Sequence, residues 1–261
     1  MLPPVIVMPL HDPAELMLPL LASVTPPLKE LFVRAIVSVT AITWQTQPER
    51  VAALHADPFF HVIQHQRALP VGEDFALLYS TAAAACPPHQ VLHLCYIDRV
   101  AYALGSEHRD QFMADVRSVR PEQTPLVFQR SQAAWQTHPR NYQEIEPMAT
   151  LAGQWLFGVT LDFAWCHLAL QAQQLAAVMP HVSRQDISIV AEMLLPLRHQ
   201  ARTKEVDWLA WEDPFVFGRD PAVLKREREG SMDETHKRLA YVIPMLELLY
   251  QASLCETGRA G

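Results

Sequence analysis

Short apolar runs alternate with segments of helical spacing through the first half of the chain. Apolar runs that are rich in β-branched residues and bounded by proline are typical of buried strands. The predicted strands are Pro4–Pro9, Leu31–Thr40, Phe59–His65 and Val91–Ile97. The predicted helices run from Asp12 through Leu20 to a stop at Pro26-Pro27, over Gln47–Ala56 and over Asp74–Ala85. This alternation predicts an α/β fold with a mostly parallel sheet flanked by helices.

The second half of the chain has a mainly helical pattern. Strands are predicted at Pro125–Arg130 and Val206–Trp211, and helices within Arg109–Val116, Ser131–Met179, Asp186–Leu197, Pro221–Arg228 and Asp233–Leu254. Cys166 and His167 fall in an apolar helical segment and are expected in the core. The apolar positions of the last helix predict core packing, with a homodimer surface as the alternative. Because no repeat or linker interrupts the pattern, we expect a single domain over residues 1–261 with a C-terminal helical elaboration.

The composition is that of a globular protein with an acidic balance. Of 261 residues, 50% are hydrophobic and 19% are charged, and the formal net charge is -7. An acidic chain lacks the basic surface that a general nucleic-acid binder needs, so we expect no nucleic-acid partner. The cysteines form no closely spaced metal-binding pair, and the N-terminus has no secretory pattern. No apolar stretch is long enough to span a bilayer, so we expect a cytoplasmic protein without a transmembrane segment.

Glycine is scarce, which removes several phosphate-binding motifs from consideration. The chain has 8 glycines and no G-x-G-x-x-G fingerprint for a dinucleotide. The segment GQWLFGVT at 153–160 has the outer glycine spacing of a P-loop, but Val159 stands where the phosphate-binding lysine belongs. No serine lies in a G-x-S-x-G elbow, so a hydrolase triad has no support.

The stretch QVLHLCYIDR, from Gln90 to Arg99, combines a predicted buried strand with charged residues at its end. Asp98 and Arg99 follow the apolar run directly. In an open α/β sheet, the carboxyl ends of the strands are where ligands bind. Asp98 is therefore a candidate ligand-binding residue. The alternative is that Asp98 caps the helix that follows.

The strand order and several short motifs together resemble GT-A type glycosyltransferases, which have the nucleotide-diphospho-sugar transferase fold. The resemblance rests on VIVMP, AIVSVT and LHLCYID, and it covers roughly the first 130 residues. The segments DRVAYAL and FQRSQAAWQTHP are further similar to a bacterial glycosyltransferase-like group, as far as Leu224. The resemblance implies that residues 1–130 bind a nucleotide sugar and that residues 131–261 form the acceptor side and the C-terminal helices. The implied activity is transfer of a sugar from a nucleoside diphosphate donor to an unknown acceptor.

The resemblance also implies roles for particular residues. The donor is expected at Pro9, His11, Thr40, Asp98, Arg99, Arg130 and His138. Asp98 and His138 would hold a divalent metal, Mn or Mg, and Arg99 or Arg130 would contact the diphosphate. The candidate catalytic acids are Glu144 and Asp186. The alternatives are plain strand-to-helix connections at Pro9, His11 and Thr40, a structural salt bridge at Arg99 and a solvated acid at Glu144. Asp186 and Glu192 fall on different faces of their predicted helix, which argues against a paired-carboxylate site there.

One departure from the family pattern concerns the metal motif. The family ends this strand in Asp-x-Asp, whereas this chain has Tyr96-Ile97-Asp98. A phenol with a pKa near about 10 is a poor ligand for Mn²⁺ or Mg²⁺ at neutral pH. Three alternatives stay open. Asp98 holds the metal together with water and diphosphate, or Arg99 and Arg130 act without a metal, or the chain is a non-catalytic binding or assembly module of the same fold.

Overall fold

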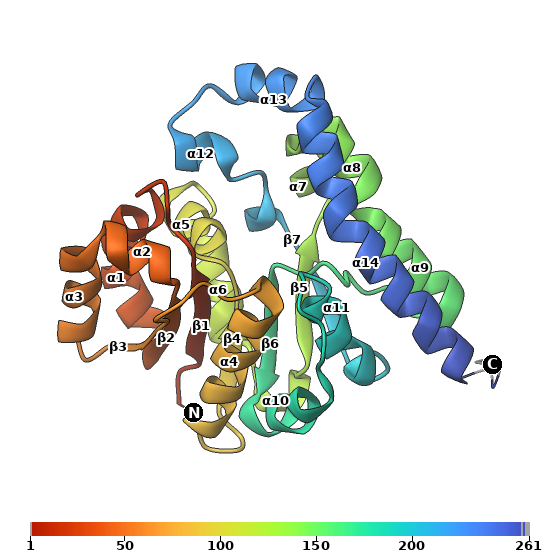
Figure 1. Ribbon diagram of the computed structural model, residues 1–261, viewed down its shortest axis with the longest axis horizontal. Helices are drawn as coiled ribbons and strands as arrows, with labels where there is room; N and C mark the ends of the chain where they lie inside the picture. The colour runs from red at the N-terminus through yellow and green to blue at the C-terminus, as the bar shows by residue number, and fades with distance from the viewer. Residues whose placement is uncertain (1, 257, 259–261) are drawn as a thin grey trace.

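The protein is built on a seven-stranded sheet with the strand order β3-β2-β1-β4-β6-β5-β7 (Figure 1). The computed structural model describes residues 2–256 and 258. The strands are β1 (Val5–Leu10), β2 (Arg34–Val39), β3 (Phe60–Gln64), β4 (Val91–Leu94), β5 (Leu126–Arg130), β6 (His167–Gln171) and β7 (Arg202–Val206). Strand β6 runs antiparallel to its neighbours β4 and β5, and every other pairing is parallel. The predicted α/β fold with a mostly parallel sheet is confirmed.

Helices cover both faces of the sheet. The first half contributes α1 (Met17–Leu31), α2 (Ala41–Thr46), α3 (Pro48–Ala56), α4 (Val71–Ala84), α5 (Ile97–Gly105) and α6 (Arg109–Ser118). The second half contributes α7 (Gln132–Thr137), α8 (Arg140–Ile145), α9 (Pro147–Phe157), α10 (Ala172–Val178), α11 (Ile189–Leu194), α12 (Asp213–Phe217), α13 (Pro221–Glu229) and α14 (Met232–Glu256).

Alternate residues of β1 enter two separate cores, because successive side chains of a strand point to opposite faces. Ile6 and Met8 pack in the core beneath α1, α5 and α6. Val5 and Val7 pack in the core beneath α4, α10 and α11. This second core continues to α14, which lies alongside α8 and α9 as the predicted C-terminal helical elaboration (Figure 1).

Helix α1 does not stop at Pro26-Pro27, so the predicted boundary was wrong. It continues to Leu31 because its apolar residues keep one buried face, formed by Leu18, Leu21, Val24, Leu28 and Leu31. A proline leaves the carbonyl four residues earlier without a helical donor. Here those carbonyls belong to Ala22 and Ser23, which are exposed residues, so the carbonyls without a helical donor fall on the solvent side of the helix.

Strand β6 lies inside Ser131–Met179, the segment predicted to be helical. That prediction was therefore wrong in part. Its sequence HLALQ has no alternation of apolar and polar residues because the strand is central and buried on both faces. Cys166 and His167 are buried, as expected, but on or beside this strand and not on a helix.

Strand β7 is Arg202–Val206, so the prediction of a strand at Val206–Trp211 was wrong. As an edge strand it is largely exposed, and its polar sequence RTKEV hides it from a search for apolar runs. The tryptophans that follow it fill the core from a short 3-10 turn and the loop after it.

The last helix combines buried and exposed apolar residues. Val242, Met245 and Leu249 are buried, which confirms the predicted core packing. Ile243 and Tyr250 are exposed, and a homodimer through this helix stays a prediction. Within the described residues, no helix has the length and apolar character needed to cross a bilayer.

We predict that Gly72→Ala destabilises the fold. At the start of α4, the Gly72 amide donates to Gln185 O (3.0 Å), and an added Cβ would lie 2.2 Å from the Arg184 carbonyl oxygen. Overpacking against a backbone atom costs about 1–3 kcal/mol. The matched control is Gly230→Ala, whose Cβ would meet nothing closer than 3.4 Å. Urea unfolding at pH 7 should show the loss only in the first variant, and equal losses in both variants would contradict this packing.

Candidate functional site

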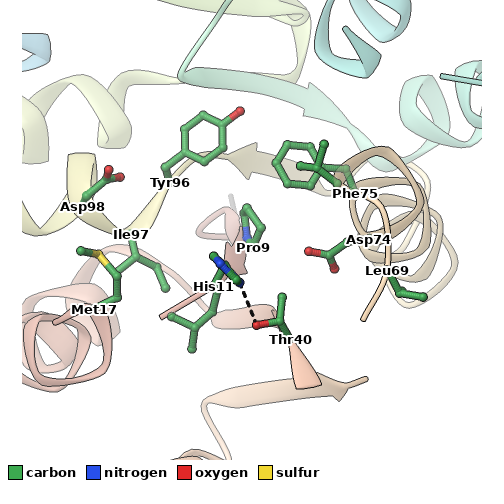
Figure 2. A pocket seen from close by; sticks show the side chains of 12 residues that line it. Pro9, His11, Met17, Thr40, Leu69, Asp74, Phe75, Tyr96, Ile97 and Asp98 are labelled. Atoms are coloured by element: carbon green, nitrogen blue, oxygen red, sulfur yellow. Dashed lines mark hydrogen bonds between the residues drawn. The ribbon is translucent and has the colours of Figure 1, made fainter. Parts of the chain in front are cut away.

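A cavity of about 440 Å³ opens at the edge of the sheet where β1, β2 and β4 end (Figure 2). Its apolar walls come from Pro9, Leu10, Met17, Leu69, Val71, Phe75, Tyr96 and Ile97. Its polar side chains are those of His11, Thr40, Asp74 and Asp98. The position agrees with the rule that open α/β sheets bind ligands at the carboxyl ends of their strands.

Hydrogen bonds fix the turn that follows β1. The Asp12 amide donates to Thr43 Oγ1 (2.7 Å), and the Asp12 carboxylate accepts from the Leu16 amide (2.7 Å). Thr40 Oγ1 lies 2.9 Å from Thr43 Oγ1 and 3.2 Å from His11 Nδ1. These bonds hold His11 and Thr40 side by side at the cavity, as the close-up shows (Figure 2).

Asp74 places a buried carboxylate on the wall of the same cavity. It belongs to the first turn of α4 and lies 2.7 Å from His65 Nε2, and both side chains are buried. A carboxylate accepts hydrogen bonds at two oxygens, so Asp74 can accept from a ligand N–H group while it contacts His65.

A second cavity, of about 560 Å³, adjoins the first. Val71, Tyr96 and Asp98 line both cavities, so the Tyr96 ring and the Asp98 carboxylate stand at their junction. The apolar wall of the second cavity includes Trp165, Phe217, Tyr241 and Met245. Its charged side chains are those of Asp98, Arg99, Arg130, Glu146, Glu212, Asp213, Arg228, Lys237 and Arg238.

Arg130, at the end of β5, is buried and paired with acids from two later segments. Its guanidinium lies 3.0 Å from Glu146 and 3.9 Å from Asp162, and it stacks over the Trp135 ring at 4.3 Å. Glu146 also accepts from Arg238 of α14 at 3.0 Å. Burial alone would raise the pKa of Glu146, but Arg130 and Arg238 outweigh it and hold the pKa below its ordinary value.

The first residue of α12, Asp213, and the residue before it, Glu212, bring two acids to the second cavity. Glu212 forms a buried ion pair with Arg99, and Asp213 lies 3.2 Å from Arg228. Burial raises the pKa of Asp213, and Arg228 and Arg99 oppose that shift. Among the residues that the structure describes, no acid forms an ion pair with Lys237, which is exposed.

The structure brings together most of the residues predicted for the donor site. Pro9, His11, Thr40 and Asp98 line the first cavity, and Asp98 lines the second together with Arg99 and Arg130. Arg99 and Arg130 both form buried ion pairs, so the salt bridge expected as the alternative for Arg99 is present.

His138 and the two predicted catalytic acids lie away from both cavities. His138 is fully buried, and its Nδ1 lies 3.0 Å from the Ala134 carbonyl oxygen. Burial and the nearby Arg130 charge lower its pKa. Glu144 is exposed and pairs with Arg140 at 2.7 Å, as expected for a solvated acid. Asp186 accepts from the Ser188 amide (2.8 Å) at the turn before α11. Neither acid lines the cavities, because local partners hold both elsewhere.

Sequence reasoning missed Glu212, Asp213 and the basic residues of α13 and α14. The signal for the first two was available, since adjacent acids follow the apolar run VDWLAW directly. Because VDWLAW was predicted to be a strand, the start of a helix at Asp213 was not recognised. Lys237 and Arg238 lie in a segment of mixed charge that resembles any solvated helix face.

The residues at the junction supply one carboxylate for a divalent metal ion. Asp98 accepts only the neighbouring Arg99 amide (2.8 Å) and forms no ion pair in the described part of the chain. Glu212 and Asp213 are engaged by arginines, and Tyr96 offers a phenol whose pKa burial raises. Mn²⁺ or Mg²⁺ requires several oxygen ligands. The protein side chains therefore do not build a complete site for either ion.

We predict that Glu146→Gln lowers stability by about 3 kcal/mol at pH 7, because it removes the closest acid of two buried arginines and leaves only the more distant Asp162 beside Arg130 and Glu234 beside Arg238. The pKa of Glu146 is lowered in the folded state, so its contribution is present above about pH 4.3 and is lost as the pH falls through the folded value. Urea unfolding at pH 7 and pH 3.5 should therefore show a gap between wild type and variant that narrows in acid. The control Glu144→Gln should change little. A gap that does not depend on pH would contradict the ion-pair account.

Comparison with known proteins does not identify the chain. No protein-family model matches the sequence, and no curated protein matches it significantly. The function is therefore argued from the geometry and charge of the adjoining cavities.

Proposed function

We propose that the protein binds a nucleoside diphosphate sugar across the two cavities and transfers the sugar to an acceptor held in the second. The observation that carries this proposal is the junction of the cavities at Tyr96 and Asp98, at the carboxyl end of β4. A ligand that spans this junction places one end in the first cavity, among mainly apolar side chains. Its other end lies in the second cavity, among charged side chains. The sheet order, with one reversed strand between β4 and β5, is consistent with a GT-A type fold.

The first cavity suits the nucleoside. Met17, Phe75 and Ile97 offer apolar surface for the flat base, and Thr40 and Asp74 offer hydrogen-bonding groups for its edge or for the ribose. The diphosphate then passes the junction into the second cavity, whose lining includes Arg228, Lys237 and Arg238 to offset its charge. This arrangement requires no metal built by protein ligands.

The second cavity suits the transfer step. The acceptor hydroxyl oxygen forms a bond to the anomeric carbon, the bond from that carbon to the diphosphate oxygen breaks, and the electron pair leaves with the diphosphate. Asp213 takes the hydroxyl proton. A carboxylate whose pKa is raised is a better base near neutral pH than an ordinary one, and burial raises that of Asp213.

A second candidate function is ligand binding without turnover. Tyr96 favours it, because the side chain occupies the position of the first motif acid and lines both cavities. In this case the chain is a non-catalytic module of the same fold. The two functions share the donor site and differ in whether a sugar is transferred.

We predict binding of at least one of UDP-glucose, GDP-mannose and ADP-glucose in titration calorimetry, with and without Mn²⁺. With Mn²⁺ present, Asp98→Asn should weaken that binding about tenfold, which corresponds to about 1.4 kcal/mol, because it removes the carboxylate that can bridge to the diphosphate through the ion. The control Glu144→Gln should bind as wild type does, because Glu144 is exposed and outside both cavities. If none of the three nucleotide sugars binds under either condition, the proposed donor site is wrong.

We also predict that Tyr96→Asp creates metal dependence. The change restores a second carboxylate two residues before Asp98, so Mn²⁺ gains a further oxygen ligand at the junction. Mn²⁺ should tighten nucleotide-sugar binding at least tenfold in this variant and less in wild type. Tyr96→Phe is the control, because it keeps the ring and adds no ligand. An equal Mn²⁺ effect in Tyr96→Asp and Tyr96→Phe would show that position 96 does not face the diphosphate.

A further inference from the structure

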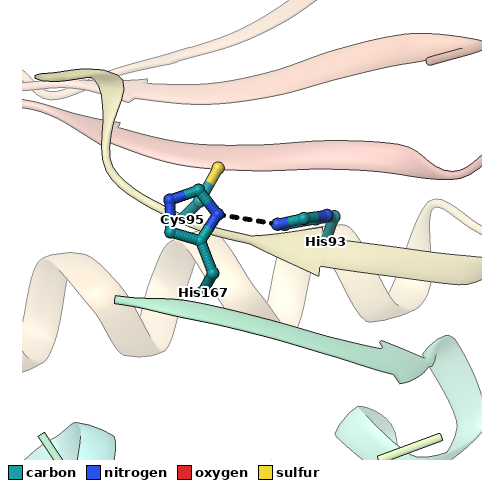
Figure 3. Close-up of side chains that lie close together, drawn as sticks. All are labelled: His93, Cys95 and His167. Carbon is teal, nitrogen blue, oxygen red and sulfur yellow. Dashed lines mark hydrogen bonds between the residues drawn. The ribbon is translucent and has the colours of Figure 1, made fainter. Parts of the chain in front are cut away.

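Three metal-binding side chains meet in the core behind the candidate site. His93 and Cys95 lie two residues apart on β4 and its continuation, so they share one face of the sheet. Leu94 pairs with Leu168 of antiparallel β6, and one further step in this register places His167 opposite Cys95. His93 pairs with Ala169, whose small side chain leaves room for an imidazole ring. The pairing of β4 with β6 therefore brings the two imidazole rings and the thiol close together in the core (Figure 3).

The distances are close to those of a first coordination shell. One ligand atom from each of His93, Cys95 and His167 lies within 4.8 Å of the others, and His93 Nε2 lies 2.8 Å from His167 Nδ1. Nitrogen and sulfur ligands of one tetrahedral or trigonal ion lie about 3.3–3.7 Å apart. The two nitrogens must therefore separate by about half an ångström and the sulfur must approach by no more than about one and a half ångströms, which small side-chain rotations allow.

The polar groups of this cluster are not fully satisfied by one another. His93 Nδ1 and His167 Nε2 are buried, and neither has a hydrogen-bond partner in the part of the chain that the structure describes. Only one of the two facing nitrogens can carry the shared proton. Either tautomer therefore leaves one N–H group and one lone pair without a hydrogen-bond partner. Apolar side chains at positions 93 and 167 would avoid the free-energy cost of these unpaired groups. The presence of two buried histidines therefore calls for a functional explanation.

The type and protonation of the ligands select the class of metal. Burial lowers the pKa of His93 to about 3 and lowers that of His167 well below its ordinary value, so both imidazoles are neutral and able to ligate. No carboxylate joins the cluster among the described residues, which disfavours Mg²⁺ and Mn²⁺. Burial raises the pKa of the Cys95 thiol, so its thiolate forms only when a metal displaces the proton, and two imidazoles with a thiolate favour soft or borderline ions such as Cu⁺ and Zn²⁺.

The surroundings favour the ion that needs the fewest ligands. Aromatic rings close around the imidazoles, namely those of Phe32, Phe112, Phe128 and Trp208. Among the described residues, no further histidine, cysteine or carboxylate joins the cluster as a fourth ligand, and Zn²⁺ in structural sites almost always takes four. We propose that His93, Cys95 and His167 form a buried three-coordinate site for a soft metal ion, Cu⁺ in preference to Zn²⁺. Binding displaces the thiol proton of Cys95 and forms one sulfur–metal and two nitrogen–metal bonds.

Such an ion would link β4 to β6 one residue before Tyr96. Because the ligands come from two neighbouring strands, the metal would hold the carboxyl end of β4 in place behind the junction of the two cavities. The role is structural, since the cluster faces the core and lines neither cavity. This site is independent of the proposed sugar transfer.

The test is anaerobic refolding of the full chain with Cu⁺ or with Zn²⁺, followed by desalting and elemental analysis. The background is Cys255→Ser, which removes the exposed cysteine. We expect one copper and no zinc per chain and a rise in the thermal midpoint of about 5 °C or more. Cys95→Ser and His167→Gln should lose the copper, whereas the control Cys86→Ser, at another buried cysteine, should keep it.

X-ray absorption of the copper-loaded chain identifies the ligands without reliance on variants that fold poorly. Two nitrogen ligands and one sulfur ligand are expected. One zinc and no copper per chain would overturn the copper assignment. The absence of both metals, or copper retained in folded Cys95→Ser, would overturn the site.

Discussion

Two buried guanidinium groups hold the two halves of this protein together. Arg99 and Arg130 lie at the end of the sheet, and an unpaired charge in such a place costs several kcal/mol. Their partners come from later in the chain, with Glu212 next to Arg99 and Glu146 next to Arg130. Helix α14 then adds Arg238 to the Glu146 carboxylate. Glu212 thereby fixes the start of α12 at the sheet edge, and Glu146 links α14 to the same edge through Arg238, so these segments form the wall of the second cavity.

The same interactions explain the character of the candidate site. Because most of its charges are already paired, the second cavity is polar without being strongly basic. Asp98 and Lys237 are exceptions within the described residues, since neither forms an ion pair. Asp98 lies at the junction with the first cavity and Lys237 in the wall of the second. A ligand with both hydroxyl and phosphate groups matches this distribution better than a purely apolar one.

The sequence predicts the first half of the fold well because its strands and helices carry local signals. Apolar runs rich in β-branched residues mark β1 and β2, and Asp98 lies in the first turn of α5, four residues after the end of β4. Strand β6 was missed because a strand buried on both faces has no alternation to detect. The continuation of α1 through Pro26 was missed because the local sequence does not show the burial of Leu28 and Leu31. That burial outweighs the loss of helical hydrogen bonds at the prolines.

The candidate site was predicted in part, for a related reason. Residues at strand ends, such as Thr40 and Asp98, can be placed from the topology alone. Glu212 and Asp213 reach the cavity through partners that lie more than a hundred residues earlier or in later helices, and no local pattern records such contacts. His138 lines neither cavity, and the Thr-His-Pro motif gives no sign that its ring turns inward toward the Ala134 carbonyl.

The central claim is that one ligand spans both cavities through the junction at Tyr96 and Asp98. The most direct measurement is a crystal structure of the chain soaked with the nucleotide sugar that binds most tightly. The account predicts the base between Met17 and Phe75, the diphosphate beside Asp98 and the sugar facing Asp213. A nucleotide bound elsewhere, or a Tyr96 ring that blocks passage between the cavities in the bound state, would contradict it.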